Sequence, residues 1–330
     1  MMNKKKKGNK RGMFVLLCIL AFLVSFIGSV VFKITYTSPE LRKYSVEWSK
    51  EIGTVYTDIS YGEKDANKFD IYLPVDNTKE AYGLVVYLHA GGFTTGDKSD
   101  DAKMLQWLCS KGYVAAGINY TLKSDKNPEA NVYTQSVEIK ESIPHVIEEA
   151  KKLGYNINQM AISGGSAGHA LAMIYAYRDA NTSPVPVKMV FGGVGPSSFY
   201  PEDWDIYGFD KTDDKTKENA ALFFSVMAGK EIKKEDIGTS KYDEKIKDIS
   251  AVAWIDENGV PSLLAYGKYD KVQPFKASIR LSETLKKYNV PHDYIVFEHS
   301  GHALQNDSKE SKLYLQKIEE YLAKYLPLGE

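Results

Sequence analysis

Cysteine is scarce in this chain of 330 residues, in which only Cys18 and Cys109 occur. Cys18 lies inside an apolar stretch near the N-terminus, so the rest of the chain holds one cysteine and cannot form an internal disulfide. Leu17, not a small residue, precedes Cys18, and this argues against a lipid-modified cysteine. Internal repeats and the ligand spacings typical of metal sites are also lacking, which argues against repeat architectures and zinc modules.

Acidic residues are absent from the first 33 positions, which hold 7 of the 42 Lys and Arg residues. The remaining positions carry 35 basic and 43 acidic residues, and their net charge of −8 argues against nucleic acid as a partner. Positions 13–32 are 20 uncharged and mostly apolar residues that follow a basic tail at 1–12. At ~1.5 Å per residue, this stretch can span a ~30 Å hydrocarbon core.

The apolar stretch is longer than the ~7–15-residue core of a signal peptide, and no Ala-x-Ala-like cleavage site follows it. We therefore expect a single-pass signal anchor at 13–32. The positive-inside rule then places the N-terminus in the cytoplasm and the folded domain outside the cell membrane. Secretion after cleavage of this segment is the alternative. A linker at 33–52 would lead into one folded domain at 53–330.

Ser166 lies in the pentapeptide GGSAG at 164–168, between an apolar run at 160–162 and a helix-forming run at 170–175. This order matches the strand, tight turn and helix of a Gly-x-Ser-x-Gly nucleophile elbow. Glycines flank such a serine because a side chain would crowd the sharp turn. The pentapeptide also occurs by chance in roughly one chain in ten of this length. Its surroundings must therefore decide between a nucleophile and a plain turn of small residues.

A second glycine motif, HAGGF at 89–93, follows a predicted buried strand. Glycines at such a turn let the main chain approach a developing negative charge, where a side chain would block the way. We expect the N–H groups of Gly91, Gly92 and Ala167 to form an oxyanion hole. His89 is expected to hold this loop in place, not to carry protons.

Two further groups complete the pattern of a catalytic triad. Asp270 and His302 each follow a predicted strand, and the chain order Ser166, Asp270, His302 is that of α/β-hydrolase enzymes. His299 is a second candidate for the base. His302 is favoured because it follows a glycine and lies further beyond the strand end, where it can reach over the nucleophile.

These motifs resemble those of the α/β-hydrolase carboxylesterases, in particular the hormone-sensitive-lipase and feruloyl-esterase-like (BD-FAE) groups. The resemblance covers about residues 53–327 and rests on HAGGF at 89–93, GGSAG at 164–168, YGKYDKV at 266–272 and SGHAL at 300–304. It implies a nucleophile, an acid, a base and three oxyanion donors, at Ser166, Asp270, His302, Gly91, Gly92 and Ala167. Ala90 replaces the first glycine of the usual His-Gly-Gly-Gly run and leaves these donor positions intact.

The remaining pattern predicts an α/β fold, with a mostly parallel sheet, helices on both faces and an inserted helical cap. An antiparallel edge is expected at 55–59 and 69–73. Further strands are expected at 83–88, 113–119, 158–163, 187–192, 262–267 and 293–298, and helices near 98–111, 134–153, 167–179, 275–288 and 309–325. The segment 196–247 is the cap. Its aromatic residues either pack the cap itself or shape a substrate pocket, in which we place Trp204 together with Phe93.

The sequence therefore predicts a serine hydrolase that cleaves small-molecule, carbohydrate or lipid esters without a metal or an organic cofactor. Two alternatives stay open. One is a serine peptidase or amidase on the same fold, and the other is a non-catalytic, membrane-tethered binding module. The complete triad argues against the binding module.

Overall fold

The computed structural model describes residues 44–329, and the chain from Ser45 onward forms one compact unit. The basic tail at 1–12 and the expected membrane span at 13–32 lie outside the described residues, so the signal anchor stays a prediction. Within residues 44–329, no helix combines the length and the apolar character needed to cross a bilayer.

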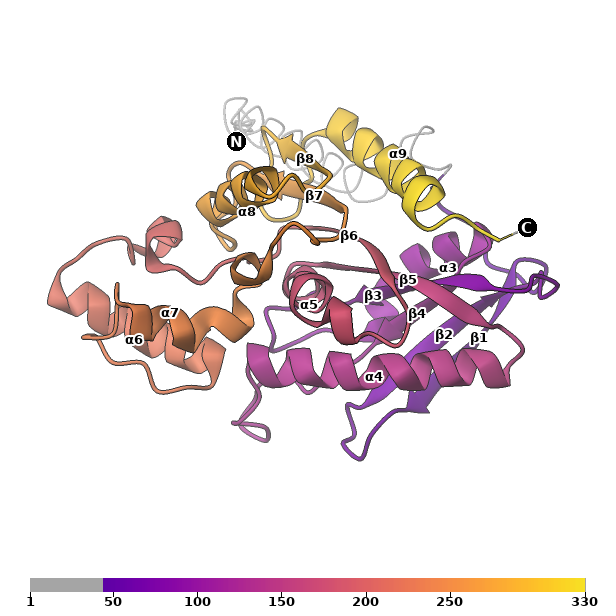
Figure 1. Ribbon diagram of the computed structural model, residues 1–330, viewed down its shortest axis with the longest axis horizontal. Helices are drawn as coiled ribbons and strands as arrows, with labels where there is room; N and C mark the ends of the chain where they lie inside the picture. Colours follow the sequence, from indigo (N-terminus) through magenta and orange to yellow (C-terminus); the bar gives the residue numbers. More distant parts are fainter. Residues whose placement is uncertain (1–43, 330) are drawn as a thin grey trace, which may run out of the picture. The chain divides into compact units, whose positions relative to one another are not determined.

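Eight strands of this described part form one sheet, in the order β1-β2-β4-β3-β5-β6-β7-β8 (Figure 1). They are β1 (Gly53–Ser60), β2 (Lys68–Pro74), β3 (Tyr82–Leu88), β4 (Val114–Ile118), β5 (Ile157–Gly165), β6 (Val187–Gly193), β7 (Ser262–Gly267) and β8 (His292–Phe297). The pairs β1 with β2 and β2 with β4 are antiparallel, and the other neighbours are parallel. The predicted α/β-hydrolase fold is confirmed.

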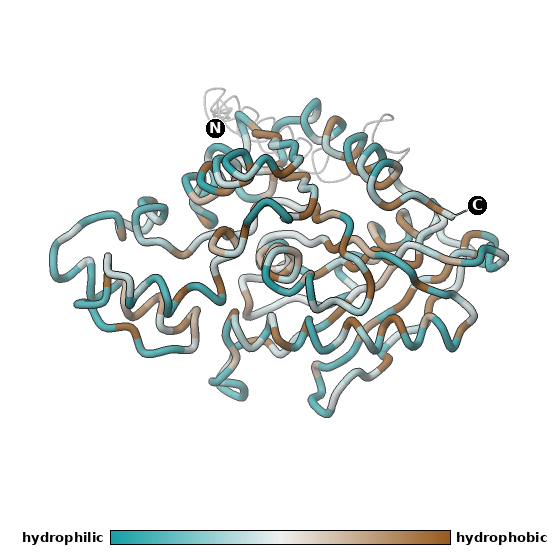
Figure 2. Tube along the Cα trace, viewed as in Figure 1, coloured by the Kyte–Doolittle hydropathy of each residue, from teal (hydrophilic) through white to brown (hydrophobic). Residues whose placement is uncertain are grey.

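Helices cover the sheet on both faces, and for this reason β3 and β4 are buried along almost their whole length. The helices that flank the sheet are η1 (Lys98–Asp101), α3 (Ala102–Ser110), α4 (Val132–Lys152), α5 (Ala167–Ile174), α8 (Phe275–Lys287) and α9 (Ser308–Tyr325). Helices α4 and α5 pack against each other on one side of the sheet (Figure 1). Hydrophobic residues follow the central strands and the inner helix faces, whereas hydrophilic residues lie on the outer faces (Figure 2).

Helix α5 is shorter than the predicted helix at 167–179. The regular helix ends at Ile174, and the chain continues as a π-helical segment, η2 (Tyr175–Asp179), and a short turn, η3 (Ala180–Thr182). The side chains of Arg178 and Asp179 in this segment are largely buried and paired with each other, and Lys140 of α4 lies 3.2 Å from the Asp179 carboxylate. The carboxylate is therefore compensated although it is removed from water.

The connection between β6 and β7 carries the segment predicted as the cap. Its elements are η4 (Pro201–Asp203), η5 (Asp205–Tyr207), α6 (Asp214–Ala228), α7 (Ser240–Ile246), η6 (Lys247–Ile249) and η7 (Ala251–Trp254). Helices α6 and α7 lie side by side, away from the strands (Figure 1). Six aromatic residues form what we call the cap aromatic cluster, with ring centroids 5.2–6.4 Å apart: Phe199, Trp204, Tyr207, Phe209, Phe223 and Phe224.

Candidate active site

Ser166 occupies the sharp turn between β5 and α5. Its backbone is left-handed, with φ 50° and ψ −118°, which is a strained conformation for a residue with a side chain. A Cβ on Gly164 would lie 2.4 Å from the carbonyl carbon of Gly168, and a Cβ on Gly168 would lie 1.9 Å from the carbonyl oxygen of Leu88. These two glycines are therefore required by close contacts. A Cβ on Gly165 would have no contact shorter than 3.8 Å, so close contacts do not require a glycine at that position.

The structure brings the three predicted triad residues together in one hydrogen-bonded line. The Oγ atom of Ser166 lies 2.9 Å from Nε2 of His302, and Nδ1 of His302 lies 2.7 Å from Oδ2 of Asp270. The other carboxylate oxygen, Oδ1, accepts the backbone N–H groups of Val272 at 2.8 Å and Gln273 at 2.9 Å. Because the carboxylate accepts, Nδ1 of His302 carries the proton, and Nε2 is left to accept the Ser166 hydroxyl.

The structure also separates the two candidate histidines. The side chain of His299 is 79% exposed, and its Nδ1 lies 2.8 Å from Oδ1 of Asp307. His302 alone reaches Ser166 among the described histidines. His299 and Asp307 thus form a second acid–histidine pair a few residues from the candidate triad, which makes them a useful control.

The predicted oxyanion loop has left-handed backbone at Gly91, Gly92 and Phe93, with φ 126°, 60° and 67°. The carbonyl of Gly91 accepts the N–H groups of Thr94 at 3.1 Å and Thr95 at 3.0 Å. In a trans peptide the N–H points away from the C=O, so these bonds turn the N–H of Gly92 to the opposite side, where Gly92 lines the cavity at Ser166.

The second expected donor is oriented by the same geometry. The carbonyl of Ser166 accepts the N–H of Ala170 within the first turn of α5, at 3.0 Å. The N–H of Ala167 therefore points out of the helix N-terminus, where the helix dipole favours negative charge. Gly92 and Ala167 both line one cavity with Ser166. Gly91 lines a second, more open cavity at the same serine.

His89 holds the oxyanion loop, as expected. It is fully buried, its Nδ1 donates to the carbonyl of Ala90 at 2.7 Å, and its ring stacks on Tyr120 at 4.3 Å. Burial lowers the pKa of His89, which favours the neutral ring. The bond to Ala90 fixes the peptide unit that carries the N–H of Gly91.

Two cavities meet at Ser166. The smaller, of about 180 Å³, lies between the oxyanion loop and the cap and is the less open of the two, and we call it the enclosed cavity; its lining includes Phe93, Trp204, Tyr207, Phe223 and Met227. Its lining contains no Asp, Glu, Lys or Arg side chain. The larger, of about 410 Å³, is more open and is lined by Ala90, Gly91, Val194 and Val272, among others.

Both predicted pocket residues, Phe93 and Trp204, line the enclosed cavity, and Trp204 also belongs to the cap aromatic cluster. Its indole N–H donates to the carbonyl of Ser198 at 3.0 Å, which satisfies the buried polar atom. Sequence reasoning missed Met227 and Val194. Met227 follows Phe223 by four residues on α6, a helical spacing that could have pointed to it, whereas nothing local pointed to Val194.

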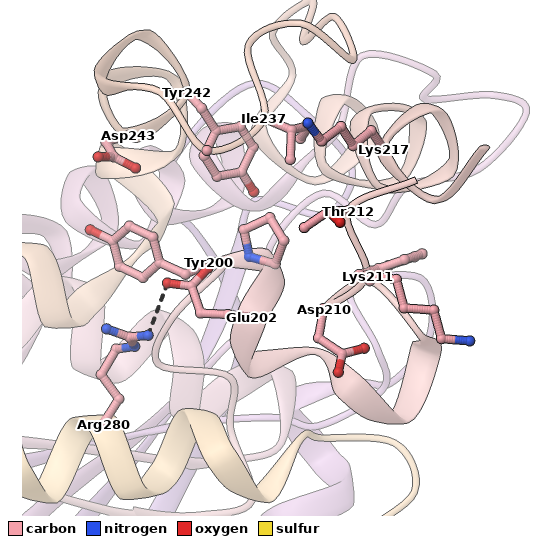
Figure 3. Close-up of a pocket in the computed structure, with 13 residues that line it drawn as sticks. Tyr200, Glu202, Asp210, Lys211, Thr212, Lys217, Ile237, Tyr242, Asp243 and Arg280 are labelled. Carbon is pink, nitrogen blue, oxygen red and sulfur yellow. Dashed lines mark hydrogen bonds and ion pairs between the residues drawn. The ribbon is translucent and has the colours of Figure 1, made fainter. Parts of the chain in front are cut away.

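A further cavity, of about 490 Å³, lies in the cap and contains no triad residue (Figure 3). Arg280 of α8 lines it and lies 3.1 Å from Glu202, the ion pair dashed in Figure 3. The same guanidinium donates to Oδ1 of the buried Asp203 at 3.0 Å. Asp203 directly precedes Trp204, so Arg280 ties the turn that carries Trp204 to the helix that follows the Asp270 loop.

Fold and site together define an α/β-hydrolase with a Ser-His-Asp arrangement. The sequence model of the BD-FAE family matches residues 69–285, which is more than half of the chain. The chain belongs to the BD-FAE family, and this confirms its predicted place among the α/β-hydrolase carboxylesterases.

Curated relatives match parts of the chain. A kynurenine formamidase from Salmo salar is 28% identical over 133 residues, which are 40% of this chain and 42% of that protein. A probable isoprenylcysteine alpha-carbonyl methylesterase from Oryza sativa subsp. japonica is 22% identical over 264 residues, which are 75% of this chain and 58% of that protein. The chain thus spans less than two thirds of the length of these relatives.

Solved structures agree in fold. A truncated carbohydrate esterase from gut microbiota superposes with a TM-score of 0.65 at 17% identity, over 84% of this chain and 98% of that chain. The butyrate-bound Est2 esterase of Thermogutta terrifontis superposes with a TM-score of 0.65 at 20% identity, over 83% of this chain and 95% of that chain. At these identities the likeness shows the fold alone.

Proposed function

We propose that this chain is a serine carboxylesterase that works through an acyl-enzyme on Ser166. The observation that carries the proposal is the hydrogen-bonded line from Ser166 through His302 to Asp270, at 2.9 and 2.7 Å, beside an oxyanion loop with left-handed backbone. Family membership supports the same reaction class.

In the proposed mechanism, His302 takes the hydroxyl proton while the Oγ atom of Ser166 bonds to the ester carbonyl carbon. The carbonyl electron pair moves onto oxygen, which is stabilised by the N–H groups of Gly92, Ala167 and Gly91. Asp270 holds the tautomer of His302 and stabilises the imidazolium. His302 then gives the proton to the leaving alcohol, and the same steps with water as nucleophile release the acid. A donor of this kind is typically worth ~2.7–4 kcal/mol in the transition state.

The enclosed cavity favours one uncharged, apolar group of the ester. Its walls are mostly aromatic and aliphatic, and they offer no charged partner to a carboxylate or an ammonium group. The open cavity on the other side leaves room for a larger group. Small-molecule, carbohydrate and lipid esters all meet this description.

The test is hydrolysis of p-nitrophenyl acetate and butyrate by the wild-type protein and by Ser166→Ala. We expect turnover by the wild type and loss of turnover in the variant down to the residual ~10³–10⁴-fold over water that the remaining site supplies. A fluorophosphonate should label the wild type once, on Ser166, and leave Ser166→Ala unlabelled. Labelling elsewhere, or near-full turnover by the variant, would refute the assignment.

An amidase is the second candidate, because the curated matches include kynurenine formamidases. An ester and an anilide with the same acyl group separate the two activities, since they differ only in the leaving group. We expect kcat/KM for the ester to exceed that for the anilide. The opposite order would favour the amidase.

We also propose that residues 13–32 anchor the protein in the cell membrane with the catalytic domain outside. The apolar stretch and the basic tail support this proposal. The full chain should sediment with membranes, and a chain that starts near Thr35 should be soluble and active. Protease added to cells with an exposed outer membrane face should digest the catalytic domain, and full protection would refute the orientation.

A further inference from the structure

Gln135 makes a contact that links helix α4 to the oxyanion loop. It lies near the start of α4 and is fully buried. Its Nε2 donates to the carbonyl of Phe93 at 2.9 Å and to the carbonyl of Thr121 at 2.9 Å. Because both partners are carbonyl oxygens, the amide must turn its nitrogen toward them. Its oxygen has no hydrogen-bond partner among the described residues, so the donor side holds the amide in place.

The bond to Phe93 acts on a residue with strained backbone. Phe93 has φ 67° and follows Gly91 and Gly92, so three successive residues are left-handed and Phe93 alone among them carries a side chain. The carbonyl of Phe93 has a second donor, the backbone N–H of Lys123 at 3.0 Å. Phe93 also lines the enclosed cavity. The Phe93 carbonyl is thus fixed from two sides at the point where the loop passes the site.

A chain of hydrogen bonds runs from Gln135 to the oxyanion position. The Phe93 carbonyl belongs to the same peptide unit as the N–H of Thr94, which points the opposite way and donates to the carbonyl of Gly91 at 3.1 Å. The Gly91 carbonyl in turn belongs to the peptide unit that carries the N–H of Gly92. Each bond therefore sets the direction of the next peptide unit, and aligned bonds of this kind also polarise one another.

We propose that Gln135 is a positioning residue for the oxyanion hole, which aims and polarises the N–H of Gly92 through two peptide units. The inference rests on the proposed function, because it concerns the same oxyanion. The charge on the substrate oxygen develops only in the transition state. Loss of the Gln135 amide should therefore slow the reaction and weaken the binding of oxyanion mimics. It should leave the affinity for ground-state analogues unchanged.

The experiment uses Gln135→Met, which keeps the length of the side chain and removes both donors. A pair of inhibitors with the same carbon chain serves as the readout. A trifluoromethyl ketone adds the Oγ atom of Ser166 to its carbonyl carbon, passes the hydroxyl proton to His302 and places the negative charge in the oxyanion hole. The matching methyl ketone binds without this addition. Fluorophosphonate titration counts the competent sites, so all rates are stated per active site.

We expect Gln135→Met to lower kcat/KM by ~10-fold or more, a part of the ~10²–10³-fold that removal of a whole donor costs. The affinity for the trifluoromethyl ketone should fall by the same factor, and the affinity for the methyl ketone should stay within about two-fold. Ser136→Ala is the matched control. Ser136 is buried on the same helix, and its hydroxyl donates within the helix, to Tyr133 at 2.7 Å. Ser136→Ala should change none of the three values by more than about two-fold.

Gln135→Glu tests the same proposal if Gln135→Met does not fold. A carboxyl group against two carbonyl oxygens can donate only in its protonated form. The ratio of kcat/KM for Gln135→Glu over wild type should therefore rise as the pH falls. Comparing the two proteins at equal pH cancels the pH dependence that they share. A ratio that does not change with pH, with the same loss for both ketones, would overturn the proposal.

The two proposals fail in different ways. A wild-type protein that neither hydrolyses esters nor reacts with the fluorophosphonate contradicts the proposed function. An active wild type with unchanged kcat/KM per site in Gln135→Met, even with a lowered melting temperature, shows that Gln135 serves stability alone.

Discussion

Asp270→Asn is the sharpest test of the candidate triad, because the structure fixes which way the new amide must turn. Oδ1 of Asp270 accepts two backbone N–H groups, from Val272 and Gln273, at 2.8 and 2.9 Å. An asparagine can satisfy both donors only with its oxygen at that position, so its NH₂ group has to face Nδ1 of His302, 2.7 Å from the present carboxylate oxygen. The ring would then accept at Nδ1 and carry its proton on Nε2.

That tautomer cannot take the proton of Ser166, which lies 2.9 Å from Nε2. The fold should be intact, since the hydrogen-bond count hardly changes. In a Ser-His-Asp triad the wrong tautomer costs ~10⁴ in kcat, or about 5 kcal/mol at ~1.4 kcal/mol per factor of ten. We expect a loss of this size for p-nitrophenyl butyrate, measured per folded protein with circular dichroism as the check on folding.

Asp307→Asn is the control for this prediction. Asp307 pairs with His299 at 2.8 Å in the same way, yet the histidine that lies within hydrogen-bond distance of Ser166 is His302. Its substitution should reduce stability, because the carboxylate also accepts the hydroxyl of Ser300. Its kcat should stay within about ten-fold of wild type. A loss below ten-fold in Asp270→Asn, or equal losses in both variants, would contradict the assigned roles.

Three further predictions concern the base, the cap and acid stability. His302→Gln should lose most of the activity and His299→Gln little, and the reverse result in the same ester assay would exchange the two residues. Trp204→Ala should change the ratio of kcat/KM between butyryl and acetyl esters, because Trp204 lines the cavity at Ser166. It should also lower the melting temperature, since replacing a buried Trp by Ala typically costs ~3–5 kcal/mol. An equal loss of kcat/KM for all acyl lengths would show that Trp204 is a packing residue only. Burial lowers the pKa of His169 to about 3, whereas a histidine in the unfolded chain has a pKa of ~6.5. Between these two pH values the unfolded chain binds a proton that the folded chain does not, so stability falls as the pH falls. The free energy of unfolding in urea should thus drop by ~2 kcal/mol less from pH 7 to pH 5 in His169→Asn than in wild type, and equal drops would show that His169 is accessible to protons.

The parts of the site that the sequence predicted are local in the chain. The elbow is encoded within five residues, because Gly164 and Gly168 are required by contacts that arise wherever a strand turns so sharply into a helix. The oxyanion loop is likewise marked by its own glycines. The alternation of strands and helices marks where each strand ends along the chain, so the sequence alone places Asp270 and His302 at strand ends.

The parts that could not be predicted join distant positions. Gln135 and Phe93 are 42 residues apart, and Arg280 and Asp203 are 77 apart. No local pattern encodes such contacts, because a buried polar side chain looks the same in the sequence whatever it meets. The strand order has the same origin, since β4 lies between β2 and β3 and only the folded sheet reveals it. The cap aromatic residues serve both packing and the pocket, because Trp204 and Phe223 pack the cap aromatic cluster and also line the enclosed cavity at Ser166.

The left-handed residues show where the fold supports the chemistry. Of the six non-glycine residues with positive φ among residues 44–329, four lie in the loops of the candidate site: Phe93, Ser166, Val194 and Leu304. Each such conformation costs on the order of 1–3 kcal/mol, and it is most unusual for a β-branched residue such as Val194. Val194 is held because its N–H donates to Ala265 of β7 at 2.9 Å, while the carbonyl of the preceding Gly193 accepts the N–H of Ser166 at 2.9 Å. The peptide unit between Gly193 and Val194 therefore holds the strained end of β6 and the backbone of the nucleophile together. The paired strands β5, β6 and β7 supply the stability that keeps this strain in place.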